Sequence, residues 1–101
     1  MLTRQLAQEW AADGIRANCV SPGLVHTPLT QAVYAKPESR RSREALVPLH
    51  RIGDADADVA GTVAFLLGPD AAYMTGHNLL VDGGLLDSVQ THLAGRPRTV
   101  T

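Results

Sequence analysis

The residues with the clearest chemical potential stand in one short stretch, which reads IRANCVSPGLVHT at positions 15–27. Residues 15–20 are short and largely apolar, which predicts a buried parallel strand. Pro22 has no N–H for a strand ladder, and Gly23 can adopt backbone angles closed to other residues, so the chain must turn there. Open parallel sheets bind their ligands at the carboxyl ends of the strands, so this turn is the candidate binding site.

The other reactive side chains lack the spacing of a metal site or of a known catalytic pair. The sequence has no Glu-x-x-His or His-x-x-x-His pair and no Gly-x-Ser-x-Gly elbow, which argues against a metal centre and a hydrolase. Tyr34 and Lys36 are too close in sequence to share a helix face as a catalytic Tyr and Lys must. Asp54, Asp56 and Asp58 have calcium-loop spacing without the loop's glycine and final glutamate, so we expect them to cap a helix.

Two strands and several helices must position the candidate turn. Leu2, Leu6 and Trp10 recur at helical spacing, which predicts an amphipathic helix that ends at residues 13–14. A second helix is expected after the acidic residues, up to residue 67, and a second strand over residues 77–81. A strand, a connection with a helix and another strand form a crossover unit, so the two strands should be parallel.

The segment between the turn and the second helix, residues 28–50, has poorer periodicity. Thr27 offers a capping hydroxyl and Pro28 suits a first helical position, so a short helix is expected to begin there. Pro37 should divide the segment into two short helices. The tail, residues 88–101, is polar and without a clear pattern, and we expect it to be loosely ordered unless it docks on a partner subunit.

The composition is that of a globular protein with no nucleic-acid or membrane partner. The chain has 101 residues, of which 45% are hydrophobic and 19% charged, with a net charge of −1. No run reaches the roughly 18 apolar residues of a membrane span, and no signal peptide is recognised, so the expected compartment is cytoplasmic. Cys19 is the only cysteine, and its place in the strand favours a small buried side chain over a reactive thiol.

The stretch at 15–27 resembles the short-chain dehydrogenase/reductase family, whose sixth strand and following turn read Ile-Arg-x-Asn-x-x-x-Pro-Gly-x-Val-x-Thr. The resemblance continues in the family's order through LTRQLAQEWAADGIR (2–16), PLHRIG (48–53), VAGTVAFLLG (59–68) and YMTGHNLLVDGG (73–84). It implies an α/β fold, namely the C-terminal part of a Rossmann-like doubly wound parallel sheet. Two parallel strands with flanking helices would be incomplete on their own.

By this resemblance, the turn borders a nicotinamide pocket, and the cofactor is NAD or NADP. Pro22 and Gly23 would shape the turn, and Val25 would use its main-chain N–H and C=O on the nicotinamide carboxamide. Thr27 Oγ1 would contact the carboxamide or the pyrophosphate, in addition to its possible role as a helix cap. Asn18 is interpreted as a hydrogen-bonded structural residue of the strand.

The family's glycine-rich loop, catalytic Ser and Tyr-x-x-x-Lys are expected before Met1, so no catalytic residue is assigned within the chain. We therefore expect the C-terminal part of an NAD(P)-dependent oxidoreductase, inactive on its own, that transfers hydride between nicotinamide and a secondary alcohol or ketone. The alternative is a non-catalytic interaction module that docks onto full-length members of the family.

The implied organisation assigns residues 1–87 to the Rossmann-like domain, with a substrate lid at about 28–50, and residues 88–101 to the tail. The arginines of the lid are expected to form a solvated helix face, and the alternative is contact with an acidic substrate or a cofactor phosphate; they are Arg40, Arg41 and Arg43. The implied partners are a small-molecule alcohol or ketone and further copies of the chain, with a tetramer expected for an intact parent.

Overall fold

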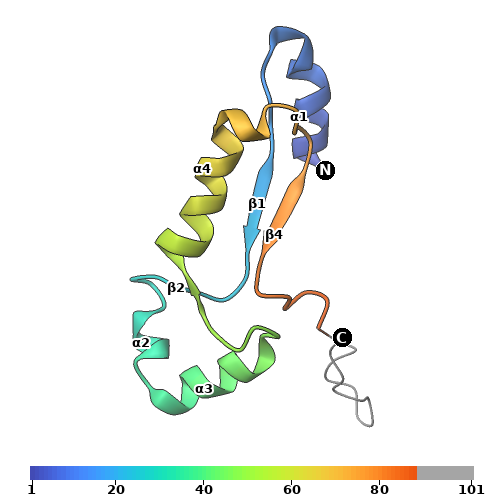
Figure 1. Ribbon diagram of the computed structural model, residues 1–101. Helices are drawn as coiled ribbons and strands as arrows, with labels where there is room; N and C mark the ends of the chain where they lie inside the picture. The colour runs from blue at the N-terminus through green and yellow to red at the C-terminus, as the bar shows by residue number, and fades with distance from the viewer. Residues whose placement is uncertain (89–101) are drawn as a thin grey trace. The chain divides into compact units, whose positions relative to one another are not determined.

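The computed structural model describes residues 1–88, which fall into two units (Figure 1). The first unit contains Met1–Pro22 and Asp54–Val81, and the second contains Gly23–Gly53 and the segment from Asp82 onward. Among the described residues, every helix is too short or too polar to span a membrane.

The first unit is built on a parallel pair of strands, β1 (Cys19–Pro22) and β4 (Asn78–Val81). Cys19 lies opposite Asn78 and Pro22 lies opposite Val81. The parallel pairing confirms the predicted crossover unit. The expected start of the first strand at Ile15 is wrong, because residues 16–18 are tied to the rest of the unit by side-chain hydrogen bonds before the strand begins.

Helices flank this strand pair, as predicted (Figure 1). α1 (Leu2–Trp10) continues into a 3-10 turn, η1 (Ala11–Asp13). α4 (Gly61–Leu67) follows one π-helical segment, η2 (Ala55–Ala60), and is succeeded by a second 3-10 turn, η3 (Pro69–Ala71). Ala7 of α1 and Leu66 of α4 are the residues that these two helices bury.

The acidic residues before α4 act as helix caps, as the sequence predicts. Asp54 Oδ1 accepts hydrogen bonds from the N–H groups of Asp56 at 2.8 Å and Ala57 at 2.9 Å, and Asp58 Oδ2 accepts from the Asp54 N–H at 2.6 Å. The N–H groups at the start of a helix have no partner within the helix, so these carboxylates stabilise its first turn. Their spacing therefore has a structural explanation that needs no calcium ion.

The second unit contains the segment that was predicted as two short helices. β2 (Val25–His26) pairs with β3 (Gly53–Asp54), and the Gly53 N–H donates to Leu24 O at 2.9 Å. Between these strands lie α2 (Gln31–Tyr34) and α3 (Pro37–Leu46), so the division at Pro37 is confirmed. The predicted helix start at Pro28 is wrong. Residues 27–30 form a turn, closed by the Thr30 N–H on Thr27 O at 3.0 Å.

Within residues 1–88, each unit buries only a few hydrophobic side chains. They are Ala7, Leu66 and Ala71 in the first unit and Tyr34, Val47 and Ile52 in the second. In the first unit Leu67 is 80% exposed and Leu2 is 67% exposed. Parallel strands are normally covered on both faces, so the β1–β4 pair is an incomplete sheet. Ser88 is buried, and the rest of the predicted tail lies outside the described residues.

Candidate functional site

The candidate turn begins where β1 ends. Pro22 lies opposite Val81 and is exposed at the carboxyl edge of the strand pair. Gly23 follows it as the first residue of the second unit, which also contains Val25 and Thr27. Three of the four predicted cofactor-binding residues therefore belong to one unit, whereas Pro22 belongs to the other.

Gly23 lies in close contact with Asp82. A Cβ atom at position 23 would stand 2.6 Å from Asp82 Cβ and 2.8 Å from Asp82 Cα. The second of these is a main-chain atom, which cannot move aside as the end of a flexible side chain can. Only glycine fits at this position, so the close approach, and not merely the turn, explains the glycine after Pro22.

Val25 and Thr27 are held together by Thr30, a residue for which no role was predicted. The Thr30 hydroxyl donates to Val25 O at 3.0 Å and accepts from the Thr27 N–H at 2.8 Å. Thr27 Oγ1 lies 3.3 Å from Thr30 Oγ1. The Thr27 hydroxyl was expected to cap a helix, but it is the Thr30 hydroxyl that closes this turn through its bonds to Val25 O and the Thr27 N–H. The available signal was the Thr-Pro-x-Thr spacing, because threonine hydroxyls commonly cap such turns.

These groups are compatible with a bound carboxamide. Val25 O keeps a second lone pair after it accepts from Thr30, so it can also accept from an amide N–H. The Thr27 hydroxyl is part-buried and can either donate or accept. A dinucleotide's pyrophosphate normally needs a Gly-x-Gly-x-x-Gly loop at a helix N-terminus, and this sequence has none. The cofactor-binding roles of Pro22, Gly23, Val25 and Thr27 stay predictions.

Asp82 shapes the turn that follows β4. Its Oδ1 accepts from the Gly84 N–H at 2.9 Å, and its Oδ2 accepts from the Leu86 N–H at 3.0 Å. The hydrogen bonds from Leu86 and Gly84 favour the carboxylate and lower the pKa of Asp82 below its ordinary value. Gly83 and Gly84 have φ angles of 64° and 94°, which side chains rarely adopt, so both glycines are required here.

Arg16 and Asn18 tie the start of β1 to the rest of the first unit. Arg16 Nη2 donates to Leu66 O at 2.8 Å, and its Nη1 donates to Met74 O at 3.1 Å. Asn18 Nδ2 donates to Met74 O at 3.0 Å, and Asn18 Oδ1 accepts from the His77 N–H at 3.1 Å. The structural role predicted for Asn18 is confirmed. The role of Arg16 was not predicted, because its partners lie far along the chain.

Tyr34 packs inside the second unit. Its side chain is 6% exposed, and its ring meets His26 edge to face, with ring centroids 5.9 Å apart and an interplanar angle of 84°. Lys36 is exposed and precedes Pro37 as the N-cap residue of α3. These positions agree with the interpretation that Tyr34 and Lys36 are not a catalytic pair.

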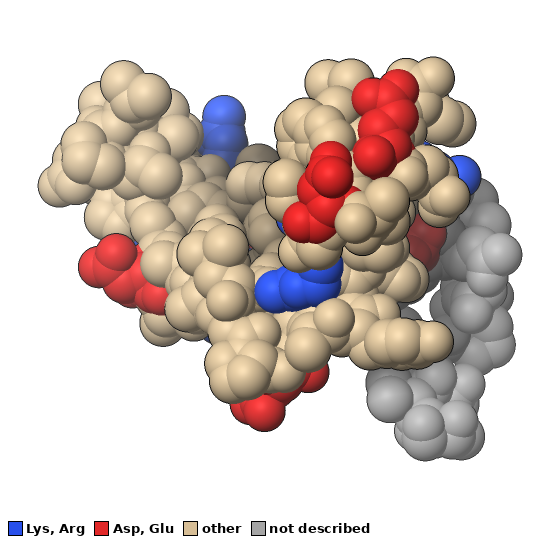
Figure 2. Space-filling model, turned by 90° about the horizontal axis from the view of Figure 1, so that it is seen from above, with Lys and Arg blue, Asp and Glu red and all other residues tan. Residues whose placement is uncertain are grey.

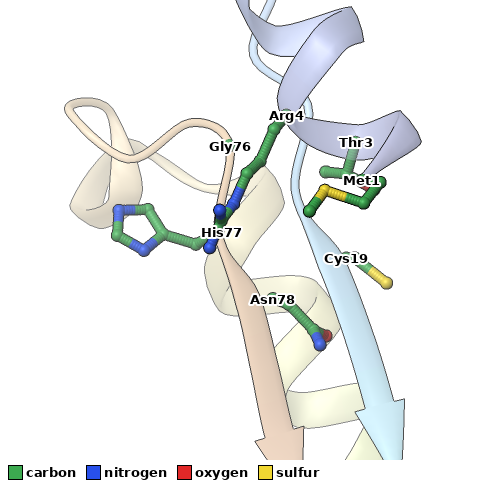
Figure 3. Close-up of a pocket in the computed structure, with 7 residues that line it drawn as sticks. All are labelled: Met1, Thr3, Arg4, Cys19, Gly76, His77 and Asn78. Atoms are coloured by element: carbon green, nitrogen blue, oxygen red, sulfur yellow. The ribbon is translucent and has the colours of Figure 1, made fainter.

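A small pocket in the first unit was not predicted (Figure 3). Its volume is about 200 Å³, and it is lined by Met1, Thr3, Arg4, Cys19, Gly76, His77 and Asn78. Figure 3 shows Cys19 and Asn78 on neighbouring strands, Arg4 extending from α1 toward His77, and the His77 ring pointing away. Small-molecule sites usually exceed about 300 Å³. Cys19 is half-buried beside this space, whereas the sequence predicted a buried side chain.

Charged side chains form small separate patches on the face seen in Figure 2, with uncharged surface between them. A nucleic-acid surface would gather Lys and Arg on one face or along one helix. Arg40 pairs with Glu44 one turn along α3, at 3.4 Å, which favours the solvated-helix interpretation of this arginine. Among the described residues, no group of three or more His, Cys, Asp or Glu side chains has the arrangement of a metal site.

Known proteins resemble this chain in sequence. The family described as enoyl-(acyl carrier protein) reductase matches residues 1–86. The 3β-hydroxysteroid dehydrogenase 1 of Eggerthella lenta is 45% identical over 85 residues, which are 84% of this chain and 32% of that protein. A tropinone reductase homologue of Arabidopsis thaliana is 49% identical over 84 residues, which are 83% of this chain and 31% of that protein. This chain thus spans about a third of the length of these relatives.

Two solved structures resemble this chain in both fold and sequence. The NADP complex of RhlG from Pseudomonas aeruginosa has a TM-score of 0.77 at 31% identity, over 83% of this chain and 34% of that chain. The 4-hydroxyisoleucine dehydrogenase complexed with NADH has a TM-score of 0.79 at 29% identity, over 85% of this chain and 35% of that chain. Both of these neighbours were solved with a nicotinamide dinucleotide.

Proposed function

The chain belongs to the short-chain dehydrogenase/reductase family, and from this premise we propose that it is the C-terminal part of an NAD(P)-dependent oxidoreductase. The proposed reaction transfers hydride between the nicotinamide and a secondary alcohol or ketone. The proposed compartment is the cytoplasm. The chain contributes part of the cofactor site, and the groups that move the substrate proton belong to the remainder of the protein.

The observation that carries this proposal is the turn after β1, where Thr30 joins Val25 O to the Thr27 N–H. When bound, the nicotinamide supplies or takes up the hydride. The Val25 main chain would pair with both sides of the nicotinamide carboxamide. Its C=O would accept from the amide N–H, and its N–H would donate to the amide oxygen. A group with one donor side and one acceptor side is oriented only when both are paired, so Val25 would select the ring face that meets the substrate.

The open edge of β1 supports the proposal that a preceding segment completes the sheet. The Cys19 N–H donates to His77 O at 2.8 Å, and in a parallel ladder the next residue directs its main-chain groups to the opposite side. Val20 therefore offers an N–H and a C=O to a further strand. A groove of about 420 Å³ lies along this part of the first unit, lined by Trp10, Arg16, Ala17, Asn18, Val20, Val63, Leu66 and Leu67.

We assign the lid role to residues 28–50, which contain α2 and α3. Leu29 at the start of this segment is 96% exposed, and Leu49 at its end is 65% exposed. An apolar residue that faces water in this structure can cover an apolar substrate when a lid closes and excludes water from the reaction. The substrate proposed for this lid is a small alcohol or ketone.

A second candidate is a non-catalytic interaction module, which the apolar surface of α4 favours. Val63 is 38% exposed, Phe65 is 43% exposed and Leu67 is 80% exposed. Apolar surface of this kind also suits contacts between copies of a full-length enzyme. We therefore propose a homo-oligomeric parent, with a tetramer as its state, and keep docking onto full-length relatives as the alternative.

Sequencing the DNA upstream of Met1 in frame separates the two candidates. The oxidoreductase proposal expects a glycine-rich loop and Tyr-x-x-x-Lys there, and NAD(P)H-linked turnover by the full-length product. The isolated chain should show neither turnover nor binding of NADPH in calorimetry, because it lacks the phosphate loop and the proton donor. Turnover by the pure 101-residue chain would disprove the incomplete-site proposal. A native start codon at Met1, with no such region upstream, would favour the interaction module.

A further inference from the structure

The turn at residues 82–86 contacts the proposed nicotinamide turn on one side. Asp82 leaves so little room beside Gly23 that a Cβ there would come within 2.8 Å of the Asp82 main chain. Leu85 N–H donates back to Asp82 O at 3.2 Å, which closes the 82–86 turn on itself. The 82–86 turn therefore lies directly against Gly23, with no room for a side chain between them.

The same turn contacts the end of the proposed lid, residues 47–49. The Leu49 N–H donates to Gly83 O at 3.2 Å. A Cβ on Gly83 would stand 2.6 Å from Val47 Cγ1, and a Cβ on Gly84 would stand 3.1 Å from Pro48 Cγ. Val47 is 2% exposed, so it cannot move away into solvent. The lid end thus rests on the two glycines that follow Asp82.

The Asp82 carboxylate gives the 82–86 turn its shape. It is the acceptor for both Gly84 N–H and Leu86 N–H, and these two bonds span the glycines with positive φ. A charged acceptor makes stronger hydrogen bonds to N–H groups than a neutral one. Glycine pairs are intrinsically flexible, so without this side chain the turn would sample other conformations.

We propose that Asp82 is a positioning residue that sets the spacing between the nicotinamide turn at Gly23 and the lid end at residues 47–49. Its carboxylate holds the 82–86 turn, and the turn holds both neighbours. This inference rests on the proposed function for its consequence in catalysis, since the lid and nicotinamide roles are themselves proposed. The mechanical coupling of Asp82 to Leu49 is independent of those roles.

The test is the variant Asp82→Asn in the protein as its gene encodes it, with Asp87→Asn as the matched control. Asp87 is an exposed acid near the same turn, so its variant makes the same charge change. Asn keeps one carbonyl acceptor and replaces the other oxygen with a donor. We expect amide hydrogen exchange to quicken about tenfold at Leu86 and at Leu49 in Asp82→Asn, and to stay unchanged in Asp87→Asn.

Two further readouts keep the outcomes distinct. In the active enzyme, Asp82→Asn should raise KM for the substrate several-fold more than it lowers kcat, whereas loss of folded protein lowers the apparent kcat alone. Faster exchange at Leu86 with unchanged exchange at Leu49 would overturn the coupling. If hydrogen exchange quickens as much at the α4 amides as at Leu86 and Leu49, Asp82→Asn has unfolded. In that case Asp82→Ser, which keeps a short hydrogen-bond acceptor, is tested instead, and unchanged exchange at Leu49 beside faster exchange at Leu86 again overturns the coupling. Coupled exchange in a protein without NAD(P)H-linked turnover would refute the proposed function and leave the coupling intact.

Discussion

The two units hold their candidate site residues by different means. In the first unit, Pro22 is placed by the register of two paired strands, and Arg16 and Asn18 anchor the strand start through main-chain carbonyl and N–H groups. Several similar main-chain hydrogen bonds hold the two paired strands together, so no single side chain decides where the strand end lies.

In the second unit, single residues decide the position of the site. Gly23 is confined by Asp82, and Val25 and Thr27 are joined through one hydroxyl of Thr30. Such a region has few redundant contacts, so it should respond sharply to particular substitutions and little to others. Substitution experiments can therefore test whether the site depends more on the second unit than on the first.

The largest effect is expected from Gly23→Ala. The added Cβ would meet the Asp82 main chain at 2.8 Å, so one of two backbones must move, at a cost of about 3 kcal/mol in the free energy of unfolding. Urea unfolding measures this cost. Gly61→Ala in α4 is the control, since no atom lies within 4 Å of its added Cβ and it should stabilise the helix by about 0.5–1 kcal/mol. Equal effects of the two substitutions would contradict the close contact at Gly23.

Arg16→Gln is expected to have the next largest effect, and it probes the first unit. It removes two charge-assisted hydrogen bonds to main-chain carbonyls, those to Leu66 O and Met74 O. The free energy of unfolding should fall by about 2 kcal/mol. Arg4→Gln on the exposed surface of α1 is the matched control and should change it by less than about 0.5 kcal/mol. If the two variants unfold alike, the first unit does not depend on this anchor.

The regular part of this fold could be predicted from the sequence. The period of Leu2, Leu6 and Trp10 predicted α1, and the two apolar runs predicted parallel strands. These patterns are local, so they can be recognised without knowledge of the rest of the fold, although Leu2 and Trp10 remain 67% and 40% exposed. The first strand was nevertheless placed too early, because the partners of Arg16 and Asn18 are separated from them by long stretches of chain.

The irregular part was harder to predict for a physical reason. Glycine at position 23 was assigned to a turn, whereas the structure shows that its neighbour Asp82 excludes any side chain. The Thr27 hydroxyl was expected to cap a helix, but Thr30 organises the turn instead. The assignment of Gly23 to a turn was incomplete and the helix cap at Thr27 was wrong; in both cases the open question was which of several competent groups makes a contact. Spacing alone does not decide that, because it depends on distant backbone or on competition between similar hydroxyls.

Thr30→Val tests whether one hydroxyl holds the candidate site residues of the second unit, and its expected effect on stability is smaller than that of Arg16→Gln. The substitution preserves shape and removes the hydroxyl that bonds to Val25 O and the Thr27 N–H. The free energy of unfolding should fall by about 1 kcal/mol, and the full-length enzyme should lose affinity for NADPH in a fluorescence titration. Thr30→Ser restores the hydroxyl and should recover both properties. Normal affinity in the valine variant would mean that the Val25–Thr27 arrangement does not orient the cofactor.

The smallest effect is expected from pH, acting through Asp82. Its pKa is lowered from the ordinary 3.8 by the Leu86 and Gly84 N–H groups, so the folded protein binds its proton less tightly than the unfolded chain does. The carboxylate's stabilisation is therefore fully present above the unfolded pKa and is lost as the pH falls through the folded pKa. Urea unfolding of the parent and Asp82→Asn from neutral pH to about pH 3 should show the stability difference shrinking with acid. A difference that stayed constant or grew would mean that the charge on Asp82 does not hold its turn, and that main-chain contacts alone shape this part of the second unit.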